Sequence, residues 1–192
     1  MRYLLSGVAL AVLLAQPALV PGQGVALSQS AVSQEDLKFA EEAAKGGLLE
    51  VQLGELATNQ AKSQDVVDFG QRMVEDHGAA NDRLKAIAQE KGITLPDSLD
   101  QDQQHTVDEL SKLSGEEFDR TYIDEMVKDH ELDVAAFRLQ AESGEDPDLR
   151  AFAEETLPTL EEHLSLAQEI DQKMAAAPGD ERRKLAGSLL QD

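Results

Sequence analysis

The sequence predicts an all-α protein whose four long helices pack together as a bundle. Aromatic residues make up only 4% of the chain and tryptophan is absent, while Ala, Leu, Glu, Asp and Gln are frequent. Such a composition favours helix over sheet. Apolar residues also recur in alternating steps of three and four, as the buried seam of a bundle requires. We expect a four-helix bundle whose helices run up-down-up-down, with a short extra helix between helices 2 and 3.

The first two long helices are predicted over 34–62 and 63–92. Ser33 precedes an acidic first turn in the manner of a capping box, and Gly92 after Lys91 is a helix-stop signal. The apolar seam of the second helix advances in the expected steps and includes a histidine. Its members are Val66, Gly70, Met73, His77, Ala80, Leu84 and Ile87.

The last two long helices are predicted over 115–143 and 147–174, and the connection at 100–113 is expected to form the short helix. One face of the third long helix carries His130, and the seam of the fourth carries His163. Start signals precede both helices, because a capping-box pair and a cap residue before a first-turn proline are typical of helix N-termini. These signals are Ser114 with Glu117, and Asp146 with Pro147.

The N-terminus has the pattern of a secretory signal peptide, which we place at 1–26 without fixing the cleavage point. Arg2 precedes an apolar run at 4–15 that is too short to cross a bilayer and is followed by small, turn-forming residues. The bundle domain is then expected at 34–174, followed by a flexible C-terminal tail at 175–192. No later stretch is apolar enough for a membrane helix, so we expect a periplasmic or secreted protein.

The charge and the absence of cysteine exclude several classes of function. The formal net charge is −21, and a surface this acidic repels nucleic acid and anionic membranes. The chain has no cysteine, which rules out disulfides, thiol catalysis and a lipid anchor on cysteine. The sequence specifies neither a protein partner nor an oligomeric state.

Four polar residues fall on the expected interior faces of four different helices. His77, His130 and His163 lie near the middle of three helices, and Glu50 lies at a matching height on the first. If the helices fold back and forth, these side chains converge in one interior layer. Such a layer is either a metal site or a hydrogen-bonded core network.

Several segments together resemble a bacterial family of exported proteins of unknown function, often labelled outer-membrane or periplasmic proteins. The resemblance covers roughly 35–171, and two Met-Val-x-Asp-His segments make it fairly specific. It implies a ferritin-like four-helix bundle and brings no established activity. The segments are GGLLEV at 46–51, FGQRMVEDH at 69–77, GEEFDRTY at 115–122, MVKDH at 126–130 and LPTLEEHL at 157–164.

The chain departs from the di-iron pattern of ferritin-like proteins, which places a glutamate three residues before a ligating histidine. Those positions hold Val74, Val127 and Leu160, so a di-iron oxidase is not expected. A mononuclear site remains open, because three imidazoles and one carboxylate suit Zn, Fe, Mn or Cu. Its ligands would be Glu50, His77, His130 and His163.

Each of the three histidines directly follows an acid, namely Asp76, Asp129 or Glu162. Ligating histidines usually donate their second N–H to a carboxylate. Neighbouring residues on a helix point about 100° apart, so each acid is expected to serve a histidine on an adjacent helix. The same acids, with Glu50 and Tyr122, could instead satisfy the histidines as a structural network without an ion.

Met73 and Met126 each precede a histidine of the layer by four residues, and thioether with imidazole suits Cu(I). If helices 2 and 3 are antiparallel, the two methionines lie a turn away in opposite directions. They would then not meet in one coordination shell, and we expect them to fill the core.

Two function hypotheses follow, and neither names a reaction. The first is an exported, non-catalytic bundle protein of the periplasm, with envelope stress as one candidate setting, whose histidine layer is structural and needs no cofactor. The second is a periplasmic metal-binding or redox protein that holds one transition-metal ion between the three histidines and the glutamate.

Overall fold

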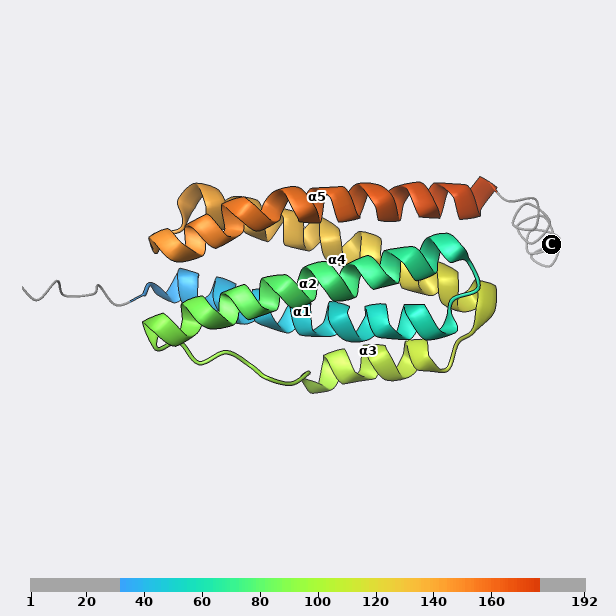
Figure 1. Ribbon diagram of the computed structural model, residues 1–192, viewed down its shortest axis with the longest axis horizontal. Coiled ribbons are helices and arrows are strands. Elements are labelled where there is room, and N and C mark those ends of the chain that lie inside the picture. The colour runs from blue at the N-terminus through green and yellow to red at the C-terminus, as the bar shows by residue number, and fades with distance from the viewer. Residues whose placement is uncertain (1–31, 177–192) are drawn as a thin grey trace, which may run out of the picture. The chain divides into compact units, whose positions relative to one another are not determined.

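The computed structural model describes residues 32–176, which form five α-helices and no strand (Figure 1). The expected all-α class is confirmed, and the helix bounds differ from the expected ones by at most two residues. The expected signal peptide and nearly all of the expected tail lie outside the described residues. The helices are α1 (Gln34–Gln60), α2 (Gln64–Lys91), α3 (Gln101–Ser111), α4 (Gly115–Ser143) and α5 (Pro147–Ala176).

Helix ends follow local chemistry at most of the expected positions. The Ser33 hydroxyl accepts from the Asp36 N–H at the start of α1, and Gly92 ends α2 in the left-handed region with φ 70°. Asp146 Oδ1 accepts from the backbone N–H of Leu149 in the first turn of α5. The two hydrogen bonds satisfy backbone N–H groups in the first turns of α1 and α5 that the helices themselves leave unpaired.

The capping box expected at Ser114 is wrong. Ser114 is extended and its side chain makes no cap hydrogen bond at the start of α4. A complete capping box forms instead at the start of α3, where Asp100 and Gln103 exchange hydrogen bonds. The Gln103 side chain also donates to the Lys45 carbonyl of α1, 2.9 Å away, and this contact ties α3 to the bundle.

The predicted up-down-up-down order of the long helices is also wrong. The backbone N–H of Ser63, at the start of α2, donates to Asp119, near the start of α4, at 2.8 Å. Asp36 at the start of α1 accepts from Gln140 at the end of α4. Therefore α2 and α4 run in the same direction, and α1 and α4 run in opposite directions (Figure 1). The reason is that the connection with α3 returns along the bundle before α4 begins.

A polar layer separates the apolar interior into two parts. One cluster of buried residues includes Leu53, Met73 and Met126, and a second includes Leu84 and Leu149. Along α2, α4 and α5, the expected histidine lies between the segments that supply these two clusters, and on α1 Glu50 directly follows Leu49 of the first cluster. The layer is therefore held between two packed cores, which fixes the helices that carry it.

Two glycines let α1 and α2 approach closely beside the layer. A Cβ on Gly70 would lie 2.7 Å from the Ala57 Cβ and 2.9 Å from the Gly54 carbonyl oxygen. Only residues without side chains permit this backbone separation. Among the described residues, no helix combines the length and the apolar character needed to cross a membrane.

Candidate metal centre

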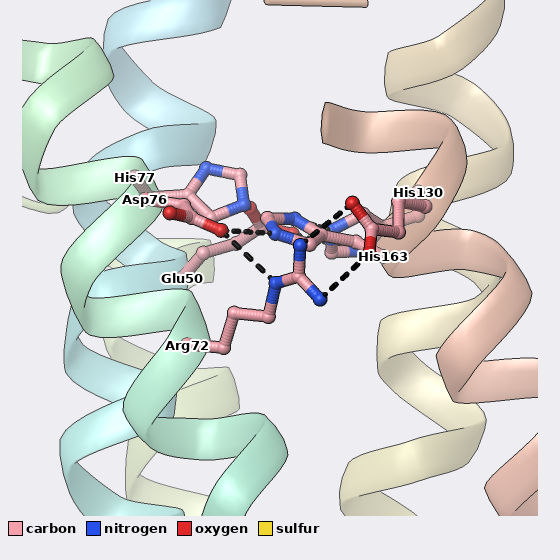
Figure 2. A network of polar contacts seen from close by, with 7 residues as sticks. Glu50, Arg72, Asp76, His77, His130 and His163 are labelled. Atoms are coloured by element: carbon pink, nitrogen blue, oxygen red, sulfur yellow. Dashed lines mark hydrogen bonds and ion pairs between the residues drawn. The ribbon is translucent and has the colours of Figure 1, made fainter. Parts of the chain in front are cut away.

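Glu50, His77, His130 and His163 come from α1, α2, α4 and α5, and their side chains meet inside the bundle (Figure 2). Their exposed fractions are 1%, 5%, 0% and 0%. The structure thus brings together the four residues that the sequence placed at one height. Burying four ionisable groups in a core is costly unless each is paired or coordinated.

The three imidazoles present nitrogen atoms to one another. One ring nitrogen from each histidine falls in a group whose members all lie within 4.8 Å of one another. His130 Nε2 lies 3.3 Å from His163 Nδ1. Metal–imidazole bonds are about 2.0–2.1 Å, so a group of this size could close around one ion through small side-chain movements.

The outer nitrogens of two of these rings are already engaged. His163 Nε2 lies 2.8 Å from Asp76 Oδ2, and His130 Nδ1 lies 2.9 Å from the carbonyl oxygen of Met126. Because a carboxylate and a carbonyl only accept, each of these nitrogens must carry the proton. In the neutral rings, the facing nitrogens of His130 and His163 are therefore both lone pairs.

Glu50 contacts the histidines without forming an aligned hydrogen bond. Its Oε2 lies 2.5 Å from His77 Nε2, and its Oε1 lies 3.3 Å from His130 Nδ1. Both carboxylate oxygens and His77 Nε2 are nevertheless buried without a hydrogen-bond partner among the described residues. Buried polar atoms of this kind normally find a partner; here Glu50 Oε2 and His77 Nε2 face each other as an ion pair, and Glu50 Oε1 has only the longer approach to His130.

Charge and burial set the ionisation of the layer. Burial disfavours the charged form of Glu50, but the neighbouring His77 and His130 outweigh it and lower its pKa to about 2. Burial lowers the pKa of His163 to about 4 and also lowers that of His130. For His77, the Glu50 carboxylate overcomes burial and raises the pKa. A proton in the metal-free layer thus belongs on His77, and the other two rings are neutral.

The expected acid partners divide into three cases. Asp76 of α2 binds His163 of α5, so an acid does serve a histidine on an adjacent helix. Glu162 makes no histidine contact and pairs instead with Arg72, whose guanidinium also contacts Asp76 at 3.2 Å. The role of Arg72 was not predicted from the sequence. The one feature of the sequence that indicates it is the spacing of four residues between Arg72 and Asp76, which places both on the same face of a helix.

Asp129 does not support a histidine, contrary to expectation, because it forms no hydrogen bond or ion pair with any described residue. It lies partly buried on α4 beside the layer, one turn from Asp133, which sequence reasoning missed. Burial and the Glu50 charge raise the pKa of Asp129 to about 7 and that of Asp133 to about 8. The signal for Asp133 was its spacing, three residues after His130 and four after Asp129.

The helix directions change the position of the methionines. Because α2 and α4 run in the same direction, Met73 and Met126 both lie one turn to the same side of the histidine layer. Both are fully buried in the same apolar cluster. The expectation that they point in opposite directions is therefore wrong, although their packing among apolar residues agrees with a role in the core.

The sequence pattern of the DUF4142 family, a domain of unknown function, matches residues 22–170. This chain belongs to the DUF4142 family. The resemblance to a family of unknown function is thereby confirmed. No functionally curated protein matches the sequence.

Solved structures share the fold of this DUF4142 protein at low sequence identity. A DUF305 fragment from Deinococcus radiodurans has a TM-score of 0.65 and 12% identity, and the match covers 74% of this chain and 98% of the fragment. A DUF305 protein from Streptomyces coelicolor that is named as secreted has a TM-score of 0.64 and 12% identity, with 74% and 93% covered. CopM in the Cu(I)-bound form has a TM-score of 0.61 and 16% identity, with 72% and 96% covered.

Proposed function

We propose that this DUF4142 chain is an exported ferritin-like four-helix bundle protein that binds one transition-metal ion through Glu50, His77, His130 and His163. Export is supported by the signal-like N-terminus and by the similarity to a protein named as secreted. The glutamates that a di-iron centre requires three residues before its histidines are replaced by apolar residues, so one ion is the simplest occupancy.

One observation carries this proposal. His130 Nε2 and His163 Nδ1 face each other at 3.3 Å while the opposite nitrogen of each ring donates to a protein acceptor. Two lone pairs at this distance repel unless a proton or a metal ion lies between them. Burial lowers the pKa of both rings, which disfavours the proton. A bound cation relieves the repulsion without adding a proton.

The three histidine nitrogens form the ligand group, and Glu50 lies outside it but contacts His77 at 2.5 Å, so a side-chain movement would bring its carboxylate to the same ion. An anionic carboxylate with three imidazoles suits Zn, Fe(II), Mn or Cu(II). The contact from His163 to Asp76 is the outer support that ligating histidines usually have. The similarity to CopM in its Cu(I)-bound form is compatible with metal binding in this fold.

A structural network is the second candidate, and a specific observation favours it. The contact of Glu50 with His77, at 2.5 Å, pairs opposite charges, and neutral His163 donates a hydrogen bond to Asp76 at 2.8 Å, so both are satisfied without an ion. A protonated His77 would then be the only cation required.

Titration of the chelator-treated protein with Co(II) separates these candidates, since Co(II) absorbs visible light in low-symmetry nitrogen and oxygen sites. We expect saturation at one equivalent, with loss of the absorption in Glu50→Gln and His130→Ala. His105→Ala is the matched control, because His105 is 73% exposed and lies away from the layer. Equal titration curves for the control and the layer variants, or no absorption in the wild type, would contradict the proposal.

A further inference from the structure

A groove of about 520 Å³ runs between α1 and α4 toward the histidine layer. Its α1 side includes Phe39 and Ala43, and its α4 side includes Phe137 and Gln140. The lining residue closest in sequence to the site is Asp133. The groove is therefore open to solvent at the end of the bundle and reaches inward to this carboxylate.

The register of the two helices places the inner end of the groove next to the proposed metal site. Asp133 lies three residues after His130 on α4, and Gly46 lies four residues before Glu50 on the antiparallel α1. Both separations are about one helical turn, or roughly 5 Å of rise. The Asp133 oxygens lie 3.9 Å from the position that a Cβ on Gly46 would take. Gly46 has no side chain, and the two Asp133 carboxylate oxygens are the atoms that lie within 4 Å of the position its Cβ would take.

The charges along this seam favour a cation. Asp129 and Asp133 form no hydrogen bond or ion pair with another described residue, and Glu50 is 1% exposed without a hydrogen-bond partner among those residues. Asp129 and Asp133 thus lie along this seam without an ion-pair partner among the described residues, whereas Glu50 faces His77 at 2.5 Å and Lys38 is the basic residue that lines the groove. Burial and the Glu50 charge raise the pKa of Asp129 to about 7 and that of Asp133 to about 8, so a divalent cation that enters displaces protons from these two groups and is then attracted by the carboxylates.

The opposite seam, between α2 and α5, has the reverse character. Arg72 contacts Asp76 at 3.2 Å and Glu162 at 2.7 Å, so its guanidinium lies across that side of the layer (Figure 2). A fixed positive charge repels an approaching metal ion, and the two acids are already neutralised. Entry through this seam would require the ion pairs to break.

We propose that the groove between α1 and α4 is the route by which a hydrated divalent cation reaches the histidine layer, and that Asp133 receives the ion at its inner end. This inference rests on the proposed function, because it assumes that the layer binds a metal. It assigns Asp133 to loading and release and leaves the coordination of the bound ion to the layer residues.

Stopped-flow mixing of the chelator-treated full chain with Co(II) tests the route. In Asp133→Asn we expect loading to slow about five- to tenfold, with a weaker dependence on ionic strength and unchanged stoichiometry. Gly46→Leu, which fills the route without changing a charge, should slow loading and chelator-driven release together. Glu131→Gln is the matched control, because Glu131 is an exposed acid on the same helix.

The outcomes distinguish this inference from the proposed function. If the wild type binds no Co(II), the proposed function fails and the route fails with it. If the wild type binds one equivalent but Asp133→Asn and Gly46→Leu load as fast as Glu131→Gln, the route is wrong and the metal site stands. Faster loading in Arg72→Gln, with no effect of Asp133→Asn, would place entry at the seam between α2 and α5.

Discussion

His130 Nε2 lies 3.3 Å from His163 Nδ1, and each ring donates its other N–H to a protein acceptor. The proposed metal site rests on this pair of facing nitrogens. A network places a donor opposite each acceptor, whereas ligands of one ion place acceptors opposite one another.

Metal should stabilise the folded chain. A ligand that binds only the native state at one hundred times its dissociation constant adds about 2.7 kcal/mol to the free energy of unfolding. We expect chelator to lower the melting temperature and the matching divalent ion to restore it, as measured by circular dichroism. A melting temperature that is unchanged by chelator and by each of Zn, Fe, Mn and Cu would support the structural network instead.

Asp76 should hold the His163 ring in the tautomer that exposes Nδ1 to the layer. Asp76→Ala removes the acceptor 2.8 Å from His163 Nε2, and loss of such an outer partner typically weakens metal binding about 10–100-fold. Asp76→Asn keeps an acceptor oxygen and should recover much of the affinity. The measurement is competition titration with a chromophoric chelator.

Nitrogen NMR of His163 supplies an independent readout for the same variants. In the metal-free wild type, the proton should reside on Nε2, and Asp76→Ala should yield a mixture of tautomers. Identical tautomer populations in the wild type and in Asp76→Ala would show that Asp76 does not position the ring.

The contribution of His163 to the stability of the metal-free protein should fall as the pH drops from 6.5 toward 4, while Asp129 and Asp133, whose pKa values are raised, contribute in the opposite sense. Burial lowers the pKa of His163 from 6.5 to about 4, so the unfolded chain takes up this proton before the folded chain does. The His163 contribution to the free energy of unfolding is full above pH 6.5. Below that pH it is lost at up to ~1.4 kcal/mol per pH unit. In urea unfolding with chelator, the change in the free energy of unfolding from pH 6.5 to pH 4 should be less destabilising for His163→Gln than for the wild type.

His77 acts in the opposite sense. Glu50 raises the pKa of His77 above 6.5, so its contribution is full below pH 6.5 and is lost as the pH rises through the folded-state value. His77→Gln should therefore change the pH dependence above 6.5 and leave the slope between pH 6.5 and 4 in place. The same slope change in both variants would contradict this assignment of protons.

Gly70 should tolerate no side chain. A Cβ there would meet the Ala57 Cβ at 2.7 Å and the Gly54 carbonyl at 2.9 Å, so α1 and α2 would have to separate beside Glu50. We expect Gly70→Ala to cost about 1–3 kcal/mol in urea unfolding. Gly78→Ala on the same helix is the control: nothing lies within 4 Å of its Cβ position, and alanine should add about 0.5–1 kcal/mol.

The helices and the height of the polar layer could be predicted from the sequence, because both depend on local order along one chain segment. Steps of three and four residues identify an interior face, and counting along each face places Glu50, His77, His130 and His163 near the middle. Neither inference requires knowledge of which helices are neighbours.

The helix directions and the outer partners could not be predicted, because both depend on how the connection between α2 and α4 crosses the bundle. A short loop makes consecutive helices antiparallel, but a connection that contains α3 can return to the starting end. Whether Asp76 meets His163 depends on α2 lying beside α5, and whether Asp133 faces Gly46 depends on α4 lying beside α1. The spacing of residues within one helix does not indicate which other helix lies beside it.

Elemental analysis by mass spectrometry tests the central claim most directly. The chain should be purified from the periplasm without a histidine tag or chelator, beside the His77→Ala/His130→Ala double variant and His105→Ala. We predict close to one equivalent of a single transition metal in the wild type and in His105→Ala, and none in the double variant. No bound metal in the wild type, even after dialysis against Zn, Fe, Mn and Cu in turn, would contradict the account and leave the histidine layer as core structure.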